Sequence, residues 1–210
     1  MKRLVTRFMS QRRPKRRLLA RLRGDNSGAA AVEFGFIVPI MFFLFVGTIE
    51  FSQALTVDRR LTLAASSTAD LIAQADKGGL TEDQVDRDLK IIEQLIAPYE
   101  LDRLHVKVIS VIAQGTPGAP DPTEYRVDWS RGSDGGTPHP RGQEYYDIPN
   151  GLLLGGESVI IGEATYNYAP LIFNYFIESA FNMTERFYLK PRNSNCVHLK
   201  PINCVTGGTI

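Results

Sequence analysis

The sequence predicts an α+β protein with a single N-terminal transmembrane helix, a long helix that continues from it, and a small domain built on an antiparallel sheet. Three observations predict this fold class. The 210 residues contain one apolar run long enough to cross a bilayer, and the charges on its two sides differ strongly. Beyond the run, helical patterns precede several short β-rich segments, which is the order typical of α+β domains. A composition of 43% hydrophobic and 22% charged residues indicates a packed core.

Residues 1–28 are a basic leader that we expect to stay in the cytoplasm. They contain ten Lys and Arg residues and one acid, Asp25, whereas the rest of the chain has 14 bases and 22 acids. Basic residues next to an apolar run mark the cytoplasmic side of a membrane. Because these bases directly precede a membrane segment, contact with anionic lipid explains them better than phosphate binding. We therefore expect no nucleic-acid partner.

Residues 29–50 are expected to form the transmembrane helix. The run 29–49 has 21 residues and a single charge, Glu33. At about 1.5 Å per residue it spans about 31 Å, which matches the hydrocarbon core of a bilayer. Seven Lys and Arg residues in 9–28, against two in 51–70, place the C-terminal part outside the cytoplasm. A cleaved secretory signal is the alternative, with a small-x-small site at Ser52-Gln53-Ala54.

Residues 51–79 are expected to form a helical stalk that continues from the membrane helix. The segment 51–76 contains neither Gly nor Pro, and its apolar and small residues recur at steps of three and four. Pro39 is expected to bend the helix, because proline removes a backbone donor and crowds the preceding turn. Gly78 and Gly79 are expected to end it.

Residues 80–210 are expected to form an α+β domain. Thr81-Glu82-Asp83-Gln84 has the pattern of a capping box, and it precedes an amphipathic helix that ends before Pro98. Segments rich in β-branched and aromatic residues predict strands at 104–113, 124–130 and 157–168. Segment 171–181 is apolar nearly all round but too short to cross a bilayer. It is expected to enter the core or to contact a membrane surface or another subunit.

The junction of leader and apolar run resembles a known processing site. Its sequence is Gly28-Ala29-Ala30-Ala31-Val32-Glu33-Phe34, and it resembles the cleavage site of type IV pilin precursors, particularly the short pilins of the tight-adherence (Tad) system. The longer string 28–50 is similar to the N-terminus of TadE-like proteins. Residues 164–171 and 188–192 are similar to the Tyr/Pro-Leu segment and the Pro-Arg ending of TadE-like ectodomains, while 80–155 carries no family signature.

This resemblance implies a minor pilin or pseudopilin of the bacterial inner membrane that acts in assembly of a tight-adherence type IV pilus, and thus in surface adhesion. It implies a periplasmic C-terminal domain and cleavage by a prepilin peptidase after Gly28, so that Ala29 becomes the first residue and Glu33 and Phe34 follow it. The implied partners are membrane lipid, other pilin-like subunits, the pilus secretion platform and the peptidase. The alternative function is a membrane-anchored periplasmic scaffold or binding protein that does not enter a fibre.

Two interpretations of Glu33 remain open. A carboxylate costs about 2.5–3.5 kcal/mol at the centre of a membrane helix, so it persists where it finds a partner. The resemblance implies that this partner is the new amine of Ala29 in a neighbouring subunit. In the other interpretation Glu33 snorkels to the interface, and Glu33 and Glu50 mark opposite faces of the membrane.

Cys196 and Cys204 are predicted to form a disulfide, because the expected topology places both in an oxidising periplasm. A zinc site of Cys196, His198 and Cys204 is the alternative, and it lacks an evident fourth ligand. The sequence contains no P-loop, dinucleotide-binding fingerprint, H-E-x-x-H or G-x-S-x-G motif. We therefore expect no enzymatic activity, no cofactor and no metal.

Overall fold

The computed structural model describes residues 27–120, 122–133, 139–172, 174, 180–201 and 204. It divides into two compact units, one that ends at Thr48 and one that extends from Ile49 to Ile210. Helix α2 (Ser27–Ala73) contributes its residues up to 48 to the first unit and the remainder to the second, with Pro39 inside the helix. Residues 1–26 of the expected leader lie outside the described residues.

One helix of the second unit begins where the sequence predicts. Helix α3 (Glu82–Glu93) starts at the predicted capping box, in which the Thr81 hydroxyl accepts from the amide of Gln84 and the Gln84 side chain accepts from the amide of Thr81. Two 3₁₀ turns follow it, η1 (Gln94–Ile96) and η2 (Leu101–Arg103). The capping box is therefore confirmed.

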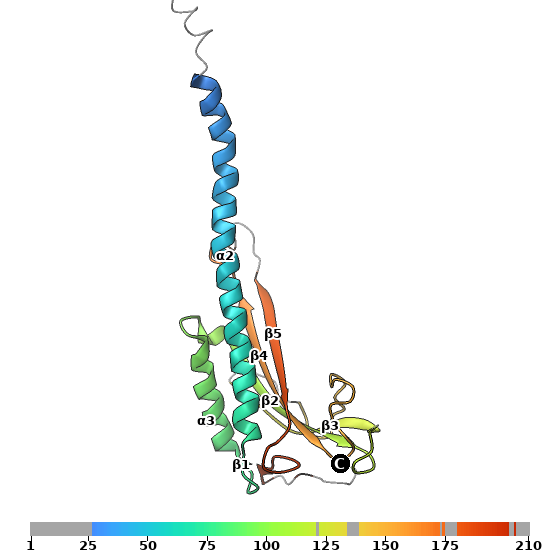
Figure 1. Cartoon of the computed structure of the whole chain (residues 1–210). Helices are drawn as coiled ribbons and strands as arrows, with labels where there is room; N and C mark the ends of the chain where they lie inside the picture. Colours follow the sequence, from blue (N-terminus) through green and yellow to red (C-terminus); the bar gives the residue numbers. More distant parts are fainter. Residues whose placement is uncertain are drawn as a thin grey trace, which may run out of the picture. The chain divides into compact units, whose positions relative to one another are not determined.

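A four-stranded antiparallel sheet forms the other layer of the second unit (Figure 1). Its strands are β2 (Leu104–Gln114), β3 (Glu124–Gly132), β4 (Ser158–Tyr168) and β5 (Phe181–Leu189), in the order β3-β2-β4-β5. The first three confirm the predicted strands, whereas β5 was not foreseen. A separate parallel pair joins β1 (Leu80–Thr81) to β6 (Leu199–Lys200).

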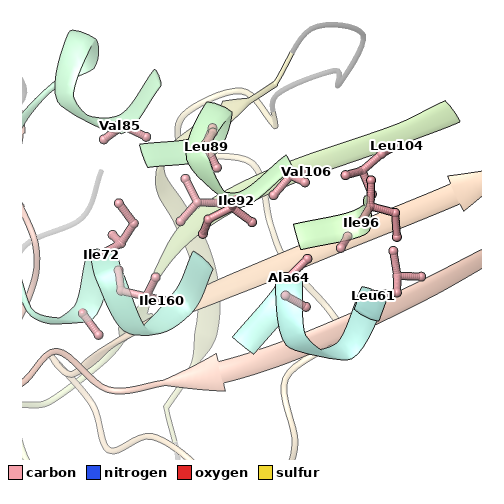
Figure 2. Close-up of a cluster of buried hydrophobic side chains, with 14 of the residues drawn as sticks. Leu61, Ala64, Ile72, Val85, Leu89, Ile92, Ile96, Leu104, Val106 and Ile160 are labelled. Carbon is pink, nitrogen blue, oxygen red and sulfur yellow. The ribbon is translucent and has the colours of Figure 1, made fainter. Parts of the chain in front are cut away.

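The main core lies between one face of the sheet and the helices. Figure 2 shows its side chains converging from α2, α3 and the strands: Leu61, Ala64, Ile72, Val85, Leu89, Ile92, Ile96, Leu104, Val106 and Ile160. Alternate residues of β2 and β4, such as Ile109 and Ile161, point to the opposite face. There they form a second cluster with Tyr145, Ile148 and Leu153. The fold is thus the predicted α+β arrangement, in which residues 49–73 of a long apolar helix pack on an antiparallel sheet.

Candidate membrane segment and processing site

The N-terminal part of α2 presents apolar side chains in every direction. All residues from 28 to 45 are exposed, among them Phe34, Phe36, Ile40 and Phe45. Exposed apolar surface is unfavourable in water by roughly 25 cal/mol per Å², so a continuous run of such side chains requires an apolar environment. One helix among the described residues, Gly28–Ala73, is long and apolar enough to cross a membrane, and it fits either a single membrane span or a signal sequence.

The residues of the predicted processing site occupy the first two turns of α2. Gly28, Ala29, Glu33 and Phe34 are all exposed. A Cβ added at Gly28 would meet nothing within 4 Å, so packing against the described residues does not require glycine there. A helical glycine costs about 1 kcal/mol relative to alanine, which leaves the choice of glycine without a folding explanation. Gly35 is equally open, so it is the spacing to Glu33 that distinguishes Gly28.

Glu33 stands alone on this apolar surface. Within the part of the chain that the structure describes, its carboxylate has neither a hydrogen-bond partner nor an ion-pair partner. Ala29 lies four residues earlier, one helical turn away in the same chain. An unpartnered carboxylate in such a run can be satisfied by a cation from another molecule or by the membrane interface. Both interpretations of Glu33 from the sequence are therefore compatible with its geometry.

Glu50 has a different environment from Glu33. It is only 6% exposed, and its carboxylate accepts a hydrogen bond from the backbone N–H of Ile172. Its backbone carbonyl accepts one from the Tyr168 hydroxyl at 3.4 Å. Glu50 therefore ties α2 to the segment that follows β4, a role that the sequence did not reveal.

Segment 171–181 is described only in part, since residues 173 and 175–179 lie outside the described residues. Leu171, Ile172 and Phe181 at its ends are exposed. These three side chains therefore do not enter the core, which was one of the two interpretations that the sequence allowed.

Cys196 and Cys204 are joined in the predicted disulfide, with their Cα atoms 6.4 Å apart. The ring Nδ1 of His198 accepts a hydrogen bond from the amide of Cys204 at 2.9 Å. The three side chains of the zinc alternative lie within 4.8 Å of one another. Because a disulfide has no thiolate to offer, they cannot form that site while the bridge is closed.

Hydrogen bonds from the sheet hold a C-terminal strap (residues 193–201) in place. Trp129 donates its indole N–H to the carbonyl of Val197 at 2.7 Å, and Ser158 donates its hydroxyl to the carbonyl of Asn195 at 2.8 Å. Val197 is buried in the main core. The strap therefore belongs to the folded domain, and the bridge restricts the freedom of its end.

The charged side chains of the second unit are used mainly in ion pairs. Arg131 forms salt bridges of 2.7 Å with Asp86 and with Glu82, and the hydrogen bond to Arg131 lowers the pKa of Asp86. Both acids stay largely exposed on α3 while they pair with this arginine of β3. A cavity of about 310 Å³ lies beside them, with Lys90 and Ser133 in its lining. Among the described residues, no histidine, nucleophile and carboxylate come together in an arrangement suited to catalysis.

Asp128 is a buried acid that sequence reasoning missed. Its side chain is fully buried, with one carboxylate oxygen 3.2 Å from Arg141 and the other without a hydrogen-bond partner among the described residues. Burial raises the pKa of Asp128 despite the nearby positive charge of Arg141. No motif surrounds Asp128 in the sequence, so no local signal could have identified it.

The comparison with protein families agrees with the resemblance seen at the junction. Residues 28–70 match the family model described as TadE-like protein. No curated protein and no solved structure matches the chain significantly. The match begins at Gly28 and ends within α2, so it includes the apolar run and excludes the sheet. That family is generally non-enzymatic, and membership in it implies a role in biogenesis of the Tad pilus and partners in its machinery.

Proposed function

We propose that this chain, which is TadE-like over residues 28–70, is a single-pass inner-membrane protein that acts as a minor pilin or pseudopilin in assembly of a tight-adherence pilus. Residues 29–50 cross the membrane, the leader lies in the cytoplasm, and the sheet domain lies in the periplasm. The observation that carries the proposal is the fully exposed apolar start of α2, which bears one unpartnered carboxylate five residues after Gly28.

The proposed mechanism has two steps that use different residues. A prepilin peptidase cleaves after Gly28, which removes the basic leader and creates an amine on Ala29. That amine, on a neighbouring subunit, then pairs with the Glu33 carboxylate and sets the axial position of one helix against the next. Glu33 has no partner among the described residues of its own chain, which supports a partner from outside.

Replacing Glu33 with alanine should impair pilus assembly without impairing membrane insertion. Glu33→Ala removes a charge that is unfavourable in a membrane helix, so the protein should reach the membrane at wild-type abundance or slightly above it. It should fail to restore pili to a strain that lacks the gene, because the amine of Ala29 would then have no partner. The matched control is Glu185→Ala, which removes an acid from β5 in the sheet domain and should restore pili normally.

Two results would count against the proposal. Normal pilus formation with Glu33→Ala would rule out the pairing step. Normal pilus formation without the gene would rule out a role in assembly, and would favour the membrane-anchored scaffold that stays outside the fibre.

A further inference from the structure

We propose that the folded domain carries a lipid-binding surface at the end that contains Glu50. This surface, the apolar rim, consists of Ile49, Phe51, Leu55, Leu171, Ile172 and Phe181. The inference rests on the proposed membrane anchoring and adds a second membrane contact, made by the domain itself with the outer surface of the bilayer.

Hydrogen bonds and one ring contact join the members of the rim. Ile172 donates its backbone N–H to the Glu50 carboxylate, which places Leu171 and Ile172 beside α2. Tyr168 donates to the Glu50 carbonyl, and its ring centroid lies 5.7 Å from that of Phe181. Ile49 and Phe51 flank Glu50 in the sequence, and Leu55 follows Phe51 by one turn. The six residues therefore gather at one end of the domain.

The rim is exposed and free of charge. Leu171 is 72% exposed and Phe51 65%, which is unusual for large apolar side chains gathered at one place. The three chain segments that meet there, 51–57, 164–172 and 180–184, contain no charged residue. The acid at the centre, Glu50, is turned inward and bound by the Ile172 amide. Such a surface excludes water without stranding a charge in lipid.

Tyrosine and arginine side chains border the rim. Tyr99, Tyr166 and Tyr168 line a cavity of about 230 Å³ together with Leu171, Arg103 and Glu100, and the Arg103 guanidinium pairs with the Glu100 carboxylate at 2.6 Å. The Arg60 guanidinium lies 5.8 Å from the centroid of the Tyr99 ring. Aromatic rings with a polar tip and long cationic side chains are the groups that proteins place at headgroup depth. The border therefore has the chemistry of a membrane interface.

Continuity with the membrane segment selects lipid as the partner. The apolar exposure of residues 28–45 resumes at Ile49 and Phe51 in the same helix. A chain anchored by residues 29–50 holds Ile49 at the boundary of the bilayer before it enters a fibre. In that state lipid is within reach, whereas another subunit is available only on assembly.

Spin labels on single introduced cysteines test the rim in the full chain. The native cysteines form a disulfide, so Leu171→Cys, Phe51→Cys, Phe43→Cys and Tyr146→Cys each offer one thiol. The proteins are reconstituted sparsely into vesicles of phosphatidylethanolamine and phosphatidylglycerol, so that subunits do not meet. Collisions with oxygen, which concentrates in lipid, are compared with collisions with a water-soluble nickel chelate. Phe43 reports the anchor, and Tyr146, which is 81% exposed, is the aqueous control.

We expect the labels at Leu171 and Phe51 to collide more often with oxygen than with the nickel chelate. Their ratio of oxygen collisions to nickel collisions should be near the ratio at Phe43 and well above the ratio at Tyr146. If the labels at Leu171 and Phe51 collide mainly with nickel, as at Tyr146, while the label at Phe43 collides mainly with oxygen, the membrane anchor is supported and the rim proposal is wrong. If both are shielded from oxygen and nickel alike, a protein surface covers them and the lipid assignment is wrong. If the label at Phe43 also collides mainly with nickel, the membrane anchoring is wrong, and the rim proposal, which depends on the anchoring, is wrong as well.

Discussion

At Gly162, in the middle of β4, the backbone of α2 leaves no room for a side chain. A Cβ there would overlap the carbonyl oxygen of Ala65 and lie 2.9 Å from the amide nitrogen of Ala69, closer than carbon and nitrogen normally approach. Ala65 and Ala69 are themselves small and fully buried. The helix can approach the sheet this closely only because all three positions are small, and the sequence does not show which residues face one another.

Gly162→Ala should therefore lower the free energy of unfolding by about 3 kcal/mol, the upper range for overpacking in a core, because a backbone cannot move aside as a flexible side chain can. The control is Gly78→Ala, where an added Cβ meets nothing within 4 Å and the change should be near neutral. Denaturant unfolding of the full chain in detergent, followed by fluorescence of the buried Trp129, measures both. Equal midpoints for the two variants would mean that α2 does not approach β4 this closely.

Asp128 and Glu163 are both buried acids, and their pKa values move in opposite directions. Burial raises the pKa of Asp128 above its ordinary value of 3.8, and Arg141 does not compensate fully. Burial alone would also raise the pKa of Glu163, but hydrogen bonds and charges from Arg186 and Lys107 lower it overall. Asp128 therefore contributes most to stability when protonated, and this contribution is lost as pH rises through its folded-state pKa. Glu163 contributes when ionised, and its contribution is lost as pH falls through its lowered pKa.

Variants of the two acids should differ from the wild type in stability in opposite directions at neutral pH. Asp128→Asn should be more stable than the wild type at neutral pH, since it removes a buried charge while keeping an acceptor for Arg141, and its advantage should shrink as pH falls toward about 4. Glu163→Gln should be less stable at neutral pH, and its deficit should shrink once acid has protonated the wild-type carboxyl. Free energies of unfolding measured from neutral pH down through the lowered pKa of Glu163 test both, each variant serving as control for the other. Parallel profiles would contradict the assigned shifts.

Among the single elements, helix α3 is determined by residues within the helix or next to it. Its 12 residues are too few for a stable helix in isolation, so the termini and the buried face decide whether it forms. The capping box satisfies backbone donors of the first turn, Glu82 and Asp83 match the helix dipole, and Val85, Leu89 and Ile92 enter the core. All of these signals lie within the helix or next to it, which is why its start could be predicted.

Thr81→Ala should lower the free energy of unfolding by about 1 kcal/mol, the usual loss when a capping hydroxyl is removed. The matched control is Thr62→Ala in α2, whose exposed hydroxyl only donates to the carbonyl of Asp58 one turn earlier. Its loss should change stability much less. The same denaturant titration compares the two, and an equal effect would mean that the capping box does not stabilise α3.

Strand β5 could not be predicted from its own residues, because the side chains that pair with it lie on β4. Its sequence mixes Asn182, Thr184, Glu185 and Arg186 with apolar residues, which is not a strong strand pattern. In the sheet its polar side chains meet matching ones on β4: Asn182 with Asn167, Thr184 with Thr165 and Arg186 with Glu163. Such cross-strand pairs stabilise a sheet but become visible only once the register is known.

At the scale of the whole molecule, features encoded in contiguous residues were predictable and those made by distant residues were not. The apolar run, the fold class and the disulfide are each read from nearby positions. The burial of Glu50 depends on Ile172, which is 122 residues away, and the rim depends on three chain segments meeting at one end. A single sequence does not state these pairings, so the polar anchor at Glu50 came only from the structure.

We propose that the chain is a membrane protein processed after Gly28. The intact mass of the protein extracted from membranes, with N-terminal sequencing of the same sample, identifies its first residue. We predict a mature protein that begins at Ala29, and a Gly28→Leu variant that stays in the membrane at precursor length because insertion depends on the apolar run. A chain that begins at Met1 would contradict processing and leave an uncut anchor. A soluble chain that begins at Leu55 would contradict the membrane assignment as a whole.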